Sequence, residues 1–96
     1  MLILAILGCS ADVCHTMCAS VALKLEGCLE EWQADWEDFD VSSRLAFGDR
    51  CREEWDAERT TLEPRQFDAA IDECTQASEE LDPMSCDELR ALYLEP

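Results

Sequence analysis

The sequence predicts an all-α domain, a small disulfide-stapled bundle of three to four helices. Apolar residues recur at intervals of three or four, which places them on one face of each helix. The chain has 96 residues and seven cysteines, a density typical of small scaffolds held together by disulfides. No stretch alternates apolar and polar residues over the length of a strand, so β structure is not predicted.

The first helix organises the rest of the bundle. We expect it to begin between Ser10 and Asp12, either of which can cap a helix, and to run toward Asp38. Three cysteines share its apolar face with residues suited to a core: Cys14, Cys18, Val21, Leu25, Cys28, Trp32 and Trp36. The bundle should therefore be cross-linked through its own core.

Two further helices follow. Ser42 or Ser43 can cap the second helix, and proline at position 64 suits the first turn of the third. The apolar face of the second helix is predicted to be Phe47, Cys51, Trp55 and Leu62. The apolar face of the third is predicted to be Phe67, Ala70, Ile71, Cys74 and Leu81.

A short fourth helix is expected after the break at Asp82-Pro83. Ser85 and Glu88 have the spacing of a capping box at its start. Its apolar face is predicted to be Cys86, Leu89, Leu92 and Tyr93.

Six of the cysteines are expected to form three disulfides: Cys14, Cys18, Cys28, Cys51, Cys74 and Cys86. Positions about the turns suggest Cys28 with Cys51 and Cys74 with Cys86. If both pairs formed, Cys14 would have to bond to Cys18. These two cysteines are one helical turn apart, where the side-chain directions are poor for bridging. We therefore expect at least one of these two pairs to be wrong and Cys14 and Cys18 each to reach a different later helix, with the connectivity left open.

The charge balance excludes one class of partner. The chain has 23 acidic residues against 7 basic ones, a formal net charge of −16. Such a charge repels phosphate backbones, so nucleic-acid binding is not expected. Such a charge keeps a small domain soluble, and binding of a cationic partner or weak binding of divalent cations is the alternative role.

The N-terminus carries a lipidation motif. Residues 1–8 are uncharged and almost wholly aliphatic, and Ile6-Leu7-Gly8-Cys9 resembles the lipobox of bacterial lipoproteins. That resemblance implies cleavage before Cys9 and lipidation of this cysteine. We expect 1–8 to be the remnant of a signal peptide truncated at its start, because eight residues are too few for a complete one. Residues 9–96 then form a single cysteine-rich helical domain with six cysteines, an even number.

The whole chain is similar to small cysteine-rich lipoproteins of unknown function from Gram-negative bacteria. The similarity implies a place in the cell envelope, with the chain anchored to a membrane through its N-terminal lipid. By the sorting behaviour of that family, Ser10 after the lipidated cysteine favours the outer membrane, facing the periplasm or the surface. Cysteine-rich composition independently indicates an oxidising compartment. The expected function is a non-enzymatic structural or protein-binding scaffold without a cofactor.

The segment Cys14-His15-Thr16-Met17-Cys18 supports an alternative function. Thiolate, imidazole and thioether groups suit soft metals such as Cu(I), so a soft-metal or thiol-redox module is the second hypothesis. On a helix, however, His15 and Met17 do not project from the face of the two cysteines, so structural disulfides are favoured and no metal site is predicted. With one histidine and no free cysteine expected, no catalytic residue is predicted either.

Aromatic residues gather before and after the first expected turn. Their spacing is typical of core positions. If exposed, they would instead form a patch for peptide or sugar recognition. Its candidate members are Trp32, Trp36, Phe39 and Trp55.

Overall fold

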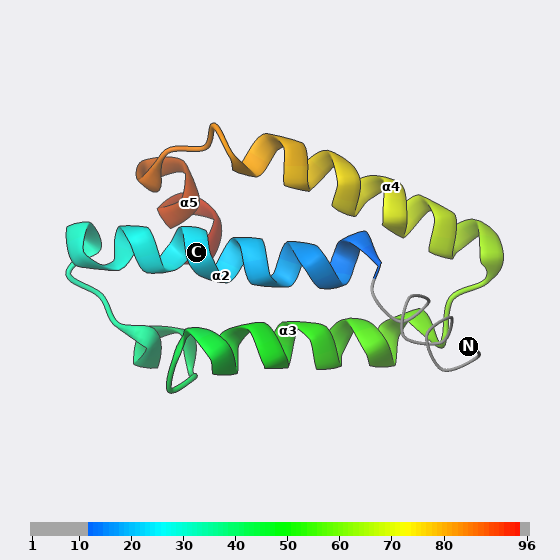
Figure 1. Ribbon diagram of the computed structural model, residues 1–96, viewed down its shortest axis with the longest axis horizontal. Helices are drawn as coiled ribbons and strands as arrows, with labels where there is room; N and C mark the ends of the chain where they lie inside the picture. Colours follow the sequence, from blue (N-terminus) through cyan, green and yellow to red (C-terminus); the bar gives the residue numbers. More distant parts are fainter. Residues whose placement is uncertain (1–11, 95–96) are drawn as a thin grey trace, which may run out of the picture.

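The computed structural model describes residues 12–94 and is helical almost throughout (Figure 1). Its elements are α2 (Val13–Trp32), the 3-10 helix η1 (Trp36–Phe39), α3 (Arg44–Arg59), α4 (Pro64–Leu81) and α5 (Cys86–Tyr93). Among the described residues there is no strand. The predicted all-α, disulfide-linked bundle is confirmed. The lipobox and Ser10 lie outside the described residues.

Helix α2 is the central element of the fold. Figure 1 shows it between α3 and α4, with α3 antiparallel to it and α4 running in the same direction as α2. The short α5 folds onto the C-terminal half of α2, where a disulfide joins the two helices. The fold is thus a central helix with three others attached to it.

The helix starts follow the expected capping chemistry. Asp12 caps α2 by accepting a hydrogen bond from the backbone N–H of His15. Of the two candidate serines, Ser43 caps α3. The capping box of Ser85 and Glu88 at the start of α5 is confirmed, since each side chain accepts a bond from the other residue's backbone N–H. Local sequence chemistry therefore sets these boundaries.

Helix α2 is shorter than predicted, ending at Trp32 rather than near Asp38. Gln33 adopts a left-handed conformation with φ 55°, and the N–H of Ala34 donates to the carbonyl of Leu29. Asp35 then caps the new helical turn of η1 through a side-chain bond from the N–H of Glu37. A left-handed residue followed by a capping aspartate is a strong stop signal, and it overrides the apolar spacing that favoured a longer helix.

The core lies along α2. Leu25 and Leu89 are fully buried, at 0% exposure. They belong to one apolar cluster that also contains Val21, Ala22, Cys28, Trp32, Phe39, Phe47 and Leu81. Every helix thus contributes to a core centred on α2.

Three predicted core positions are wrong. Leu62 lies in the connection after α3, because that helix ends at Arg59. Leu92 and Tyr93 are exposed by 65% and 42%, whereas Leu94 packs against the core cluster. Cys86 and Leu89 do pack against the core, so only the last turn of the predicted face of α5 points away from it.

Candidate functional site

Every disulfide in the described chain begins on α2. The three bonds lead from it to three different helices, α4, α3 and α5, and their pairs are Cys14–Cys74, Cys18–Cys51 and Cys28–Cys86. Their Cα–Cα distances are 5.3, 5.7 and 5.6 Å, within the usual range for disulfides. The expectation that the first two cysteines of α2 reach different helices is confirmed.

Both turn-spanning pairs suggested by the sequence are wrong. Residues 33–43 fold back beneath the end of α2 before α3 begins (Figure 1), and Arg44 Nε lies 3.4 Å from Glu26 Oε1. This offset sets Cys51 level with Cys18 instead of Cys28. After the Asp82-Pro83 break, α5 packs on α2 rather than back along α4. Cys86 therefore bonds to Cys28.

The structure separates the members of the soft-metal candidate Cys14–Cys18. Its two cysteines are buried and bonded to different helices, so neither offers a thiolate unless its bond is broken. Met17 lines a cavity, and His15 contacts the carboxylates of Asp12, at the start of α2, and of Asp56, on α3. Among residues 12–94 no group of three or more His, Cys, Asp or Glu side chains is placed to hold a metal ion.

Asp12 is the centre of a polar cluster that joins the start of α2 to the end of α3. Trp55 Nε1 donates to both carboxylate oxygens, at 3.1 and 3.0 Å, and Arg59 Nη1 donates to Oδ2 at 3.0 Å. His15 bridges two carboxylates, with Nδ1 3.1 Å from Asp12 and Nε2 2.7 Å from Asp56. Sequence reasoning found only the capping role of Asp12. The signal it missed is the i,i+4 spacing of Trp55 and Arg59, which places both donors on one face of α3.

These contacts lower the pKa of the Asp12 carboxyl group. Partial burial acts in the opposite direction, since it disfavours the charged form, but the bonds from Trp55, the His15 backbone and Arg59 and the charge of His15 outweigh it. A carboxyl group whose pKa is lower in the folded chain than the usual 3.8 stabilises the fold above that pH. The stabilisation is lost as the pH falls below 3.8 through the lower folded value.

Replacing Asp12 with Asn should therefore destabilise the fold in a pH-dependent way. Asn can still cap α2, so the variant removes the charge and keeps the cap. We expect a loss of about 1–3 kcal/mol in the free energy of unfolding at pH 7, because hydrogen bonds to a charged, mostly buried carboxylate are lost. Urea unfolding from pH 7 to pH 2 measures it. The difference in free energy of unfolding between Asp12→Asn and the unmodified chain should become smaller below pH 3.8.

A difference that stays constant with pH would contradict a role for the charge. Asp72→Asn, on the exposed face of α4, is the matched control.

The aromatic candidates do not form one exposed patch. Trp32, Phe39 and Trp55 are buried, as core residues would be. Trp36 and Phe39 form a cluster with Phe47, with ring centroids 5.7–5.9 Å apart. Trp55 lies far along α3 from them, where it stacks on Phe67 of α4 at 6.0 Å. The length of α3 therefore separates Trp55 from the aromatic residues near the first turn.

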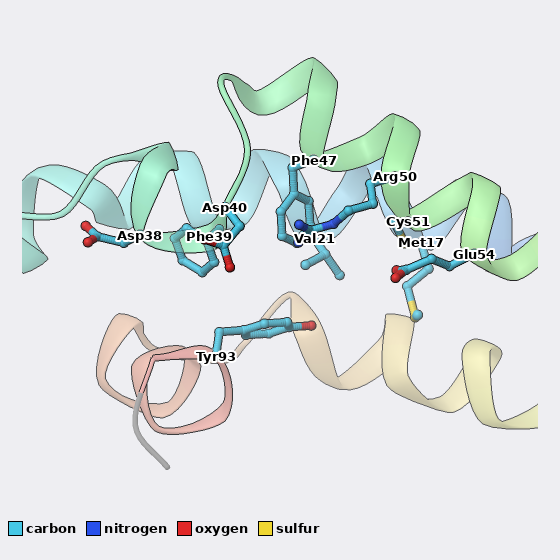
Figure 2. Close-up of a pocket in the computed structure, with 10 residues that line it drawn as sticks. All are labelled: Met17, Val21, Asp38, Phe39, Asp40, Phe47, Arg50, Cys51, Glu54 and Tyr93. Carbon is cyan, nitrogen blue, oxygen red and sulfur yellow. The ribbon is translucent and has the colours of Figure 1, made fainter.

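A cavity of about 440 Å³ opens between α3 and α5. Val21 and Met17 of α2 form its floor, and Phe39, Phe47 and the disulfide at Cys51 supply apolar walls. Figure 2 shows the ring of Tyr93 lying across the cavity, opposite Val21 and Phe47, with its hydroxyl directed toward the side of Met17 and Glu54. The complete lining is Met17, Val21, Asp38, Phe39, Asp40, Phe47, Arg50, Cys51, Glu54 and Tyr93.

Charged side chains border this apolar interior. Asp38 and Asp40 lie at one end of the cavity and Glu54 at the other (Figure 2). Arg50 is the one basic residue in the lining, and its guanidinium lies 6.0 Å from the centre of the Phe47 ring. Desolvation raises the pKa of Tyr93 above 10.0, so its hydroxyl stays protonated at neutral pH and can donate a hydrogen bond.

Sequence analysis found only part of this cavity. Phe39 was a candidate for an interaction surface, whereas Tyr93 was assigned to the core of α5. The lining comes from four separate helical elements, and the fold-back of residues 33–43 brings Phe39 against α2. A weak signal was available, because Asp38 and Asp40 flank the apolar Phe39 in the expected first turn.

Comparisons with protein families, with curated proteins and with solved structures give no match to this chain. None of the helices in residues 12–94 is both long and apolar enough to cross a membrane.

Proposed function

We propose that this chain is a non-enzymatic lipoprotein of the bacterial cell envelope, lipidated at Cys9, that serves as a protein-binding scaffold. The observation that carries the proposal is that three disulfides join one central helix to the three others. Such a framework is maintained only where thiols are oxidised, which supports an exported protein. It also makes the domain rigid, as a binding scaffold should be.

The disulfide pairing supports lipidation of Cys9. Six of the seven cysteines pair with one another within residues 12–94, so no cysteine there is left for the seventh. An odd cysteine in an exported protein needs another use. Cleavage at the lipobox and attachment of lipid to Cys9 would supply it, and Ser10 would favour delivery to the outer membrane.

Two features favour binding over catalysis. The six described cysteines are in disulfides, and both ring nitrogens of His15 contact carboxylates, so these groups already have structural partners. The cavity combines an apolar interior with a few polar groups, the arrangement that binding sites usually show. A protein partner is thus the natural ligand class for a scaffold tethered to a membrane.

The intact mass of the natively expressed protein tests this proposal. We expect a chain beginning at Cys9 with an acyl-glyceryl adduct, and six thiols that react with an alkylating label only after reduction. Cys9→Ser should abolish the adduct and release the protein from the membrane fraction, while its three disulfides remain. A retained Met1, or thiols that react before reduction, would contradict the proposal and return attention to Cys14 and Cys18.

A further inference from the structure

The cavity beside Tyr93 has a composition that selects its ligand. Its floor and walls are apolar, from Val21, Phe39 and Phe47, and all three are buried core residues. The same three belong to the core cluster, and the disulfides hold the surrounding helices. The cavity is thus largely preformed, so an apolar group can enter it with little rearrangement of the fold.

Negative charge lies at both ends of that apolar interior, and the guanidinium of Arg50 lies between them (Figure 2). Three carboxylates, Asp38, Asp40 and Glu54, lie in the lining against the single guanidinium of Arg50. They stand at both ends of the cavity, so a bound segment would meet negative charge on either side of its apolar anchor (Figure 2). The whole chain carries a formal net charge of −16, which adds a long-range attraction for cations.

We propose that this cavity binds a basic segment of a partner protein. An aromatic or aliphatic side chain of the segment enters between Val21, Phe47 and Tyr93, and flanking Lys or Arg residues pair with Asp40 and Glu54. The Tyr93 hydroxyl donates to a backbone carbonyl of the same segment. This inference names the partner chemistry of the proposed protein-binding scaffold and rests on that function.

Charge decides between this occupant and its competitors. The chain's own residues 1–8 are apolar but uncharged, so they would leave Asp40 and Glu54 without cationic partners. An acidic protein segment would be repelled by the same groups. A basic segment with an apolar anchor is the ligand that satisfies both the interior and the border of the cavity.

Fluorescence anisotropy with three synthetic peptides tests the proposal on the full oxidised chain. The first peptide has a central Phe-Leu pair with two lysines on each side. In the second, glutamates replace the lysines, and in the third, serines replace the Phe-Leu pair. We expect saturable binding of the first peptide, binding at least about tenfold weaker for each of the others, and weakening of the first by added salt.

Paired variants locate the binding. Asp40→Asn with Glu54→Gln removes two charges from the cavity border, and asparagine tolerates the left-handed conformation of residue 40, at φ 61°. The control, Asp72→Asn with Glu73→Gln, removes two charges from exposed positions on α4 that do not line the cavity. We expect about a tenfold loss of affinity for the first pair and less than about twofold for the control.

A second pair tests the apolar anchor. Tyr93→Ala removes the ring that lies across the cavity, whereas Leu92→Ala removes a neighbouring exposed side chain that is outside the lining. Only Tyr93→Ala should weaken binding of the Phe-Leu peptide. Circular dichroism verifies that all variants keep their helical content.

Several results would overturn the inference. The first is that the lysine peptide shows no saturable binding, and the second is that the serine peptide binds as tightly as the Phe-Leu peptide. The third is that the two pairs of charge variants lose the same affinity. The fourth is that spermidine, at an equal concentration of charge, displaces the peptide. In chain expressed without processing, which retains residues 1–8, nuclear Overhauser contacts between the Val21 methyl groups and Ile3 or Ile6 would instead identify the N-terminal segment as the occupant. The adduct at Cys9 and the thiol count are measured separately, on the natively expressed protein, so failure here is distinguishable from failure of the proposed function.

Discussion

Reduction of the three disulfides should unfold the domain at 25 °C. The bonds close loops of 60, 33 and 58 residues. In the chain-entropy view, loops of these lengths each contribute about 4 kcal/mol by restricting the unfolded chain. The loops overlap, so the combined effect is smaller than the sum. It is still comparable with the whole stability of a small domain, about 5–15 kcal/mol.

The second reason for this expectation is the arrangement of the core. Helices α3, α4 and α5 all pack on α2, and the short α5 buries one side chain completely, Leu89. Without the bond between Cys28 and Cys86, an eight-residue helix of this kind is not stable by itself. Loss of α5 would also remove Tyr93 from the cavity.

Far-UV circular dichroism measures this loss of structure. It compares the oxidised chain with chain that has been reduced and alkylated under native conditions. We expect the reduced chain to lose most of its helical signal and its cooperative thermal transition. The double variant Cys28→Ser with Cys86→Ser should keep α2, α3 and α4 but lose peptide binding at the cavity. A reduced chain that still melts cooperatively would show that the apolar core is sufficient without the bonds.

Replacing Leu25 with Ala should cause a large loss of stability. Leu25 is 0% exposed and lies in the middle of the central helix, in the cluster to which α3, α4 and α5 all contribute. Truncating a leucine in such a site costs about 2–5 kcal/mol, because transfer energy is lost and a void remains. The disulfides restrict collapse of the helices into that void, which favours the upper part of this range.

Leu23→Ala is the matched control. Leu23 is on the same helix, two residues away, but it is 55% exposed. Both variants have alanine in a helix interior, so helix propensity changes equally. We expect Leu23→Ala to alter the free energy of unfolding by less than about 0.5 kcal/mol in urea titrations of the oxidised protein. Equal losses for the two variants would contradict the burial that separates them.

Much of the candidate site was not visible in the sequence. The Asp12 cluster joins residues more than 40 positions apart, with Trp55 and Arg59 from α3 meeting the cap of α2. The cavity joins segments from all but one of the helical elements. Hydrophobic spacing identifies which face of a helix is buried, but it does not say which face of another helix lies opposite.

The sequence by itself determined the fold class, the cap at Ser85, the neighbouring candidates among which Asp12 and Ser43 are the caps, and the use of α2 as the cross-linked centre. These are local properties, because a cap needs a side chain within three residues and an amphipathic face needs only a repeat of three or four. Tertiary structure alone decided the disulfide partners, the orientation of α5 and the cavity. The physical reason is register: the left-handed Gln33 and the fold-back of residues 33–43 set where α3 lies along α2, and that offset selects which cysteines and side chains meet.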